Sequence, residues 1–422
     1  MKETRFKQTE IGLVPEDWKI SRLGNYCNVN GRIGFRGYTT ADLVSAGKGA
    51  LTIGGKHITH NILDLSEPDY ISWEKYYESP EIMVKPNDIV LAQRGSLGKS
   101  ALIPTGIGAA TINPSLVLLN AIKCNHQYLI YYLQSKIALD YILSINGQTS
   151  IPMISQTQIE AMDLLMPPMP EQRKIAEVLG DMDALLAELD KLIAKKRLIK
   201  QGAMQQLLTG RTRLKGFNEP WKVFSILDTF DFISNNTYSR EQMSDDGNVK
   251  NIHYGDILVK YSDVLDLSKT QLPSIINLFT TDRPLKDGDI VIADTAEDET
   301  VGKAVEVINI GDYKVEAGLH TIALSPTIQF AKGFLGFYIN STVFHDQLLP
   351  YIQGIKVSSI SKKAVSSLMM YVPSDTAEQH AIASILTDMD NEISELENKK
   401  AEYEKLKQGM MQQLLTGRIR LI

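Results

Sequence analysis

One segment occurs twice in the sequence, and this internal repeat restricts the possible folds more than any other feature. Residues 171–214 match residues 378–421 without a gap, and about half of the paired positions are identical. The difference in residue number stays at 207 from Glu171 and Glu378 to Gly210 and Gly417. The repeat therefore predicts two similar structural units.

Each copy of the repeat has the apolar pattern of a long helix. Prolines 167, 168, 170 and 373 precede the two copies, and Gly210 and Gly417 lie near their ends, as is usual at helix starts and stops. We predict two helices of about 36 residues that pair through a coiled-coil seam. Apolar residues recur every seven positions in Ile175, Met182 and Leu189, in the companion row Val178, Leu185 and Leu192, and in Ile382, Met389, Leu396, Tyr403 and Met410.

The residues before each helix predict a globular domain of mixed α and β structure. Apolar strands are expected at residues 88–92, 115–120, 289–293 and 318–324, and helices at 128–141 and 332–349. Two copies of one unit tend to pair about a two-fold axis, so we expect an α+β fold whose helices form an antiparallel coiled coil. The predicted regions are a globular domain at 1–166, a helix at 167–214, a second globular domain at 215–373 and a second helix at 374–422.

Composition places the chain among soluble globular proteins, with 43% hydrophobic and 22% charged residues. The sequence has no apolar run long enough to cross a membrane, and its first ten residues resemble no signal peptide, so we expect a cytoplasmic protein. Its two cysteines, Cys27 and Cys124, lie too far apart for a metal-binding pair. A net charge of −6 means that any binding to nucleic acid would need a local basic surface.

The sequence resembles the specificity subunits of type I restriction-modification systems over essentially its whole length. The resemblance rests on the opening TEIGLVPEDWKISRLG, on PPMPEQRKIAEVL before the first helix, and on the twice-repeated QQLLTG. It implies two target-recognition domains that each read one half of a split site in double-stranded DNA, with the helices setting the gap. The second half departs from the family pattern near residues 218–221, which lack the fuller opening motif of the first half.

The resemblance also implies the partners. Two modification (methyltransferase) subunits would dock on the repeated helices, and two restriction subunits would complete the complex. S-adenosylmethionine, ATP and magnesium would be bound by those partners, and this chain would bind no cofactor and catalyse no reaction.

Two other functions remain open. The chain could be a coiled-coil scaffold that binds proteins without binding DNA, or a nuclease with Asp294, Asp312 and Lys314 at its active site. Short carboxylate patterns arise often by chance, which disfavours the nuclease. His57 and His60 lack further ligands nearby in the sequence, so no metal site is predicted.

Candidate DNA contacts are polar and aromatic side chains on loops, because base edges in the major groove present donors and acceptors that such side chains match. The turn after residues 88–92 is no phosphate-binding loop, since Gln93 stands where that motif needs glycine, but its basic residues could contact phosphates. The candidates are Arg32, Arg36, Tyr38, Arg94, Lys99, Gln148 and Thr149 in the first half, and Lys250, Tyr254, Lys260, Lys303 and Lys356 in the second.

The identical ends of the two repeats are candidate partner-docking sites. A helix end capped by glycine would explain the glycines alone, but the identity extends further than capping requires. The predicted docking residues are Leu207, Leu208, Thr209, Gly210 and Arg211 in the first copy, and Leu414, Leu415, Thr416, Gly417 and Arg418 in the second. The basic run Lys195–Arg197 is interpreted as a solvated helix face.

Overall fold

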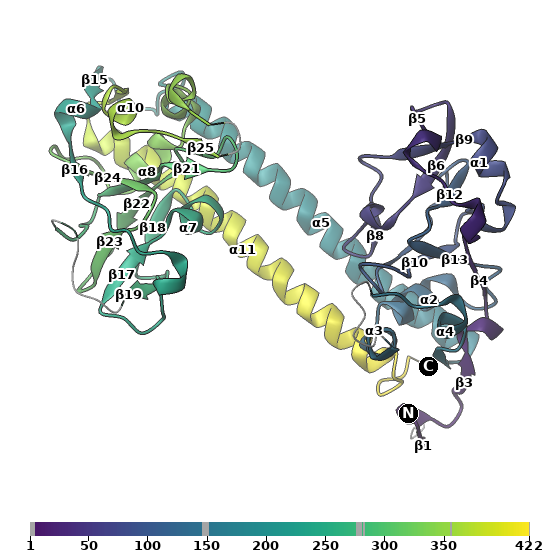
Figure 1. Cartoon of the computed structure of the whole chain (residues 1–422). Coiled ribbons are helices and arrows are strands. Elements are labelled where there is room, and N and C mark those ends of the chain that lie inside the picture. Colours follow the sequence, from purple (N-terminus) through teal and green to yellow (C-terminus); the bar gives the residue numbers. More distant parts are fainter. Residues whose placement is uncertain (1–4, 146–151, 276–280, 282, 355–356, 422) are drawn as a thin grey trace. The chain divides into compact units, whose positions relative to one another are not determined.

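The computed structural model describes residues 5–145, 152–275, 281, 283–354 and 357–421. The chain forms two compact units, shown in Figure 1: the first comprises Met1–Leu189 and Lys399–Ile422, and the second comprises Asp190–Asn398. Two long helices, α5 (Met169–Leu207) and α11 (Thr376–Leu414), have 39 residues each. Each helix is divided between the units, whereas the sequence boundaries treated each helix as a region of its own.

The globular part of the first unit contains two sheets. The larger is antiparallel and has the strand order β11-β10-β13-β4, and the second has the order β12-β6-β9-β5 with β12 parallel to β6. Every residue of β10 is buried, so this strand lies at the centre of the core. The strands are β4 (Asn28–Gly31), β5 (Leu43–Val44), β6 (Gly49–Ile53), β9 (Asp69–Ser72), β10 (Ile89–Ala92), β11 (Ser100–Leu102), β12 (Ala110–Ile112) and β13 (Leu116–Asn120).

The second unit repeats this strand order. Its larger sheet runs β22-β20-β24-β16, which corresponds to β11-β10-β13-β4, with β18 added beside β22. Its smaller sheet has the order β19-β17-β23 and again contains one parallel pair, β17 with β23. The strands are β16 (Phe230–Ile233), β17 (Val249–Ile252), β18 (Val264–Asp266), β19 (Ser274–Ile275), β20 (Ile290–Ala293), β22 (Ala304–Ile308), β23 (Lys314–Ala317) and β24 (Thr321–Pro326).

Short strands complete both units. In each unit the strand just before the earliest strand of the larger sheet pairs with the strand just before the long helix: β3 with β14, and β15 with β26. These and the remaining short strands are β1 (Phe6–Thr9), β2 (Gly12–Pro15), β3 (Lys19–Arg22), β7 (Ile58–Thr59), β8 (Ile62–Leu63), β14 (Asp163–Met166), β15 (Trp221–Ser225), β21 (Thr295–Ala296), β25 (Ser358–Ser359) and β26 (Met369–Pro373).

The two predicted short helices are each broken by a serine. The Ser135 hydroxyl donates to Tyr132 O (2.6 Å) and the Ser341 hydroxyl donates to Tyr338 O (2.5 Å), and such bonds compete with the backbone bonds of a helix. Each predicted helix is therefore two helices in the structure: α2 (His126–Leu133) with α3 (Lys136–Ile145), and α8 (Phe334–Ile339) with α9 (Thr342–His345). The other short helices are α1 (Trp73–Tyr77), α4 (Gln156–Glu160), α6 (Ile226–Thr229), α7 (Tyr254–Val259) and α10 (Lys362–Ser366).

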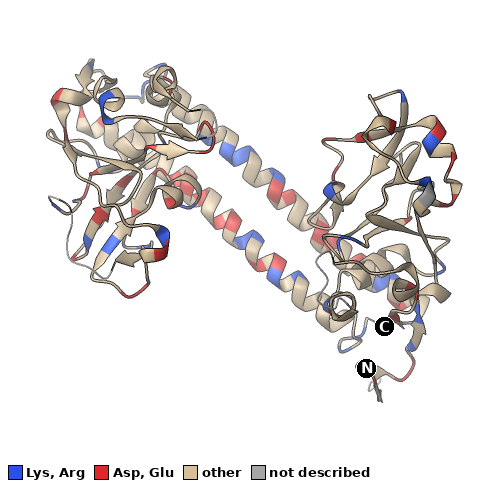
Figure 2. Ribbon diagram, in the orientation of Figure 1, with Lys and Arg blue, Asp and Glu red and all other residues tan. Residues whose placement is uncertain are grey.

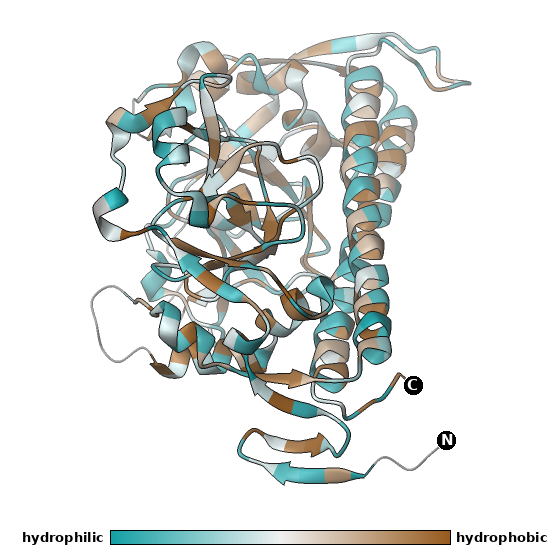
Figure 3. Cartoon of the chain, turned by 90° about the vertical axis from the view of Figure 1, so that its right-hand side faces the viewer, coloured by the Kyte–Doolittle hydropathy of each residue, from teal (hydrophilic) through white to brown (hydrophobic). Residues whose placement is uncertain are grey.

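Hydrophilic and hydrophobic residues alternate along the long helices, as the banding in Figure 3 shows. The seven-residue row that starts at Ile382 is buried or half-buried throughout. The predicted companion row of the first helix is wrong, because Leu185 and Leu192 are each 38% exposed while Leu179 and Ile193 are buried. Successive residues of an α-helix are about 100° apart around its axis, so a residue four positions on lies about 40° from the starting residue and one three positions on lies about 60° away. Positions four apart therefore stay closer to the same buried face.

Within the described residues no helix is long and apolar enough to span a membrane. The same residues contain no group of three or more side chains that could hold a metal ion.

Candidate nucleic-acid interface

The start of α5 is tied to the tail after α11 by a buried ion pair, called here the first junction (Glu171, Arg420, Trp18 and Asp17). The Glu171 carboxylate accepts from Arg420 Nε (2.7 Å), Arg420 Nη2 (2.8 Å) and Trp18 Nε1 (3.0 Å). Arg420 also donates to both oxygens of Asp17 and lies 5.7 Å from the centre of the Trp18 ring. Hydrogen bonds to Glu171 raise the pKa of Arg420. The buried carboxylate is thus fully partnered, as a buried charge requires.

The second junction (Glu378, Arg213 and Trp221) ties the start of α11 to the tail after α5. Arg213 Nε and Nη2 each donate to Glu378 at 2.6 Å, and the guanidinium lies 5.9 Å from the centre of the Trp221 ring. Trp221 Nε1 is buried and has no hydrogen-bond partner among the described groups. The second junction therefore keeps the ion pair of the first but lacks its indole bond.

A glutamine next to each buried glutamate attaches the helix start to its own globular part. Gln172 Nε2 donates to Pro167 O (2.9 Å), and its Oε1 accepts from Asn125 N (3.0 Å). Gln379 makes the same two bonds with Pro373 O (2.9 Å) and Ala331 N (2.9 Å). Both helix starts are thus positioned by duplicated hydrogen bonds.

Ion pairs also join the two helices inside each unit, and Figure 2 shows their charged residues. In the first unit Asp183 pairs with Lys407, and in the second unit Asp390 pairs with Lys200 at 2.6 Å. In the first unit Glu171 at the start of α5 meets the tail after α11, and Asp183, further along α5, meets Lys407 inside α11. In the second unit Lys200 of α5 meets Asp390, whereas the tail after α5 meets Glu378 at the start of α11. The helix segments of each unit, taken by itself, are antiparallel. Within the predicted basic run, Lys196 and Arg197 pair with Glu392 and Glu397 of α11 at 2.5 Å each.

Half of the predicted docking residues at the helix ends are buried in their own units, which corrects the prediction for those residues. Leu207 and Leu208 belong to the core of the second unit, and Leu414 and Leu415 to the core of the first. An apolar side chain that is buried in its own domain offers no surface to a partner.

The other residues at the helix ends shape the turn. Gly210 and Gly417 both have φ of +70°, and a Cβ on Gly417 would lie 2.5 Å from Pro15 Cγ. The Thr209 and Thr416 hydroxyls donate to carbonyl oxygens one helical turn earlier, each at 2.6 Å. Arg211 and Arg418 are exposed and remain candidates for docking.

The predicted DNA-binding loop at residues 31–38 is held to its own domain. Arg32 is buried (7% exposed) and donates to Ile112 O (3.3 Å) and Thr111 Oγ1 (3.2 Å). Its guanidinium is used inside the fold, so Arg32 is withdrawn as a base-contacting candidate. Arg36 forms an ion pair with Glu81 at 3.4 Å, and Tyr38 bonds to Thr52 Oγ1 at 3.0 Å.

The turn between β10 and β11 carries Arg94 and Lys99, and both side chains are exposed. Gly95 (φ +74°) and Gly98 (φ +81°) form this turn, as the sequence predicted. Arg94 Nε donates to Met153 Sδ at 3.1 Å, a weak acceptor. Gln148 and Thr149, like Lys356 in the second half, lie outside the described residues.

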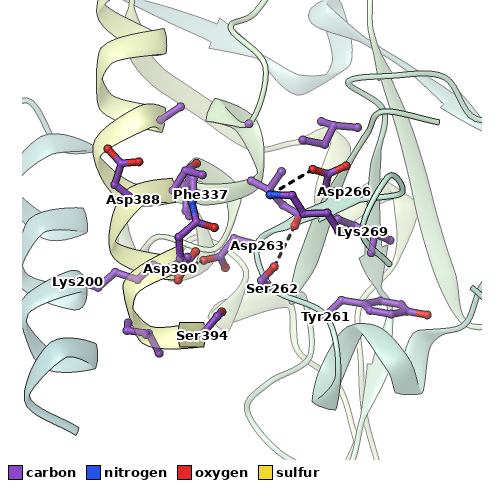
Figure 4. A pocket seen from close by; sticks show the side chains of 18 of the residues that line it. Lys200, Tyr261, Ser262, Asp263, Asp266, Lys269, Phe337, Asp388, Asp390 and Ser394 are labelled. Atoms are coloured by element: carbon purple, nitrogen blue, oxygen red, sulfur yellow. Dashed lines mark hydrogen bonds and ion pairs between the residues drawn. The ribbon is translucent and has the colours of Figure 1, made fainter. Parts of the chain in front are cut away.

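Two predicted lysines of the second unit line a groove of about 1120 Å³, shown in Figure 4. Lys260 is exposed there, and burial lowers the pKa of Lys303, whose Nζ donates to Leu258 O at 3.0 Å. One wall of the groove carries Lys200, which bridges Asp263 (2.7 Å) and Asp390 (2.6 Å). Because acidic and basic side chains alternate around it, the groove lacks the uniform positive charge that a nucleic acid attracts.

The remaining predicted residues of the second unit lie elsewhere. Lys250 Nζ donates to Ser274 Oγ (2.8 Å), and Tyr254 packs edge-on against His320 with 5.3 Å between ring centres. The nuclease hypothesis required Asp312 and Lys314 on one strand. Asp312 instead lies in the turn before β23, so the required geometry is not present.

The ends of the central strands form the same backbone framework in both units, called here the strand-end sites. In the first unit Gln93 N donates to Ser115 O (2.9 Å), and Ile154 N donates to Gln93 O (3.0 Å). In the second unit Asp294 N donates to His320 O (3.1 Å), and Ile360 N donates to Asp294 O (2.9 Å). The next residues, Arg94 and Thr295, each pair with the chain just before those isoleucines, at Met153 and Ser359.

Sequence reasoning missed both junctions and both strand-end sites. The junctions left a signal, because Arg213 and Arg420 keep the same spacing of 207 as Glu171 and Glu378. In the strand-end sites only Arg94 was already a candidate DNA contact, and the correspondence of the two sites left no signal, since their matched side chains differ in type.

Comparison with known proteins gives one consistent result. The family model described as type I restriction modification DNA specificity domain matches residues 15–200 and again 218–407. The MjaVIII specificity subunit, a type I restriction enzyme subunit of Methanocaldococcus jannaschii, is 26% identical and is aligned over 100% of this chain and 97% of its own length. The putative MjaX specificity subunit of the same organism is 27% identical, over 100% and 98%.

A chain from a structure solved to explain complex assembly and conformational transition of the type I R-M system has a similar fold. Its TM-score is 0.59 at 16% identity, and the match covers 96% of this chain and 99% of that one.

Proposed function

The chain belongs to the type I restriction-modification specificity family, as a specificity subunit with two target-recognition domains, and from this premise we propose that each domain reads one half of a two-part DNA site. The observation that carries the proposal is the pair of strand-end sites. Their backbone bonds match in the two domains, whereas their side chains differ in size, charge and hydrogen-bonding capacity. One scaffold with two sets of polar side chains suits a subunit that reads two different half-sites.

The two long helices set the distance between the half-sites. They form one antiparallel coiled coil about a pseudo-two-fold axis, and modification subunits dock on the duplicated helices. The local ion pairs and the duplicated junctions support this arrangement. Removing seven residues at matched positions of α5 and α11 would keep the apolar seam in register and shorten the gap in the site.

Catalysis belongs to the partners in this proposal. Two modification subunits bind S-adenosylmethionine, two restriction subunits bind ATP and magnesium, and the complex acts in the cytoplasm. Purified chain alone should neither methylate nor cut DNA.

Methylome sequencing tests the proposed function. Cells that express this chain with its neighbouring modification subunit are compared with cells that lack only this chain, and loss of a split methylation motif is the expected result. An unchanged methylome, with the complex shown to assemble, would favour the protein-binding scaffold. Binding measured at rising salt concentration separates these functions in vitro. A protein that binds DNA releases condensed counterions, so its affinity falls steeply as the salt concentration rises.

A further inference from the structure

The two strand-end sites contain three matched positions, and the match is defined by backbone bonds. The first position is Gln93 in the first unit and Asp294 in the second. Each of these residues donates its backbone N–H to the carbonyl of the third position, and its own backbone carbonyl accepts from an isoleucine N–H. That third position is Ser115 in the first unit and His320 in the second. Arg94 corresponds to Thr295, since each follows the first position and pairs with the loop before the isoleucine.

Three chain segments from different parts of each domain meet at these positions. The first and second positions follow the central strand β10 or β20, and the third precedes β13 or β24. The segment that holds Met153 or Ser359 closes the site from a third side. A rigid core strand thus supports residues whose side chains reach the surface, which is how recognition residues are usually held.

The two strand-end sites present side chains of opposite hydrogen-bonding character, at neighbouring positions of the framework: the second position in the first unit and the first position in the second unit. In the first unit Arg94 is exposed and supplies several donors. In the second unit Asp294 supplies only acceptors, and its Oδ1 accepts from Thr295 Oγ1 (2.7 Å) and lies 3.5 Å from His320 Nδ1. His320 is half exposed, and the Asp294 side chain is 25% exposed. The acceptor surface of Asp294 is therefore held in place and still reachable.

We propose that the two strand-end sites hold the base-reading residues of the two domains, with Arg94 donating to a guanine in one half-site and Asp294 accepting from the amino group of a cytosine or adenine in the other. The inference rests on the proposed function and deepens it. Arginine matches the two acceptors on the major-groove edge of guanine, and a carboxylate matches an exocyclic amine. Each such contact discriminates against the wrong base by about 5-fold to 160-fold in affinity, which corresponds to about 1–3 kcal/mol.

The experiment uses the complete complex of this chain with its modification subunits and a panel of duplexes. Each duplex carries one base-pair substitution in the two-part site, and the binding penalty of each substitution is measured. For Arg94→Lys, which keeps the charge but not the paired donors, we expect one G·C pair in the first half-site to lose its penalty to within about twofold. For Asp294→Asn we expect one base pair in the second half-site to lose its binding penalty, while every penalty in the first half-site is kept.

Lys99→Ala is the matched control, because Lys99 is exposed on the same turn as Arg94 but outside the strand-end site. As a phosphate contact it should weaken binding equally on all duplexes. Size-exclusion chromatography of each complex verifies assembly, and Arg94→Gln provides a second variant if Arg94→Lys does not assemble.

The outcomes test the assignment of Arg94 and Asp294 separately from the proposed two-part recognition. If the variants keep every base penalty of the parent complex, or lose affinity uniformly like the control, the assignment of these residues is wrong while two-part recognition stands. If the parent complex itself shows no base penalties in either half-site, the proposed function is wrong.

Discussion

The first and second junctions perform the same task with different numbers of bonds. Each places an arginine from one helix tail on a buried glutamate at the start of the other helix, beside a tryptophan. Arg420 is additionally bonded to Asp17, and Trp18 donates to Glu171, whereas Trp221 Nε1 has no partner among the described groups. The comparison indicates that duplication preserved the ion pair and left the surrounding bonds free to differ.

The largest effect is expected from removing the junction arginines. Arg420→Ala leaves Glu171 buried without its main partner, which should lower the free energy of unfolding of the first unit by about 3 kcal/mol or more. Arg213→Ala should have a smaller effect on the second unit, because the Arg213 side chain is 30% exposed against 9% for Arg420, and water can replace it.

Hydrogen exchange measured by mass spectrometry reports the two units separately within the full chain, so each loss can be assigned. The conservative variants Arg420→Lys and Arg213→Lys are the controls. Equal losses in the two units would show that the additional bonds of the first junction contribute nothing.

A second difference between the units concerns the residue that pairs with the first residue of the central strand, β10 or β20. In the first unit Leu102 pairs with Ile89, and in the second unit Glu306 pairs with Ile290. The Glu306 carboxylate accepts from Gly333 N (2.6 Å) and Gly336 N (2.9 Å) at the start of α8. Burial raises the pKa of Glu306 to about 7.

This raised pKa predicts a pH effect on the second unit. The folded state binds the proton more tightly than the unfolded chain, so the stabilisation is full below the ordinary pKa near 4.5 and is lost as pH rises through 7. Its upper limit is about 3 kcal/mol. Unfolding in urea is measured at pH 5 and pH 8, with protease cleavage of the second unit as the readout. The free energy of unfolding of the second unit should fall from pH 5 to pH 8 in the parent chain and fall less in Glu306→Gln. The same fall in both chains would exclude Glu306 as its source.

The smallest effect sharpens the comparison of the tryptophans. Trp18→Phe loses a buried hydrogen bond to a charged acceptor, and Trp221→Phe removes a buried donor that has no partner. Both variants lose similar volume, so we expect Trp18→Phe to be more destabilising by about 1–2 kcal/mol. Thermal unfolding of the two single variants measures this difference, and the reverse order would contradict the hydrogen-bond account.

Much of the architecture could be predicted because it depends on local patterns. The long helices, the central strands and the glycine turn at Gly95 and Gly98 follow from periodicity and turn residues. The short helices were predicted as continuous because Ser135 and Ser341 break them with hydroxyl bonds that periodicity does not reveal. The helix ends were interpreted as docking surfaces, since identity between repeats does not distinguish a shared core from a shared interface.

The sequence by itself determined the duplication, the two amphipathic helices and the family, because all three are encoded in spacing and residue type along the chain. Only the tertiary structure decided which polar residues are available for recognition. Arg32 is used inside the fold, whereas Gln93 meets Ser115, and Asp294 meets His320, across more than twenty residues of chain. Such meetings depend on strand pairing and burial between distant segments, and a single sequence does not record which distant residues become neighbours.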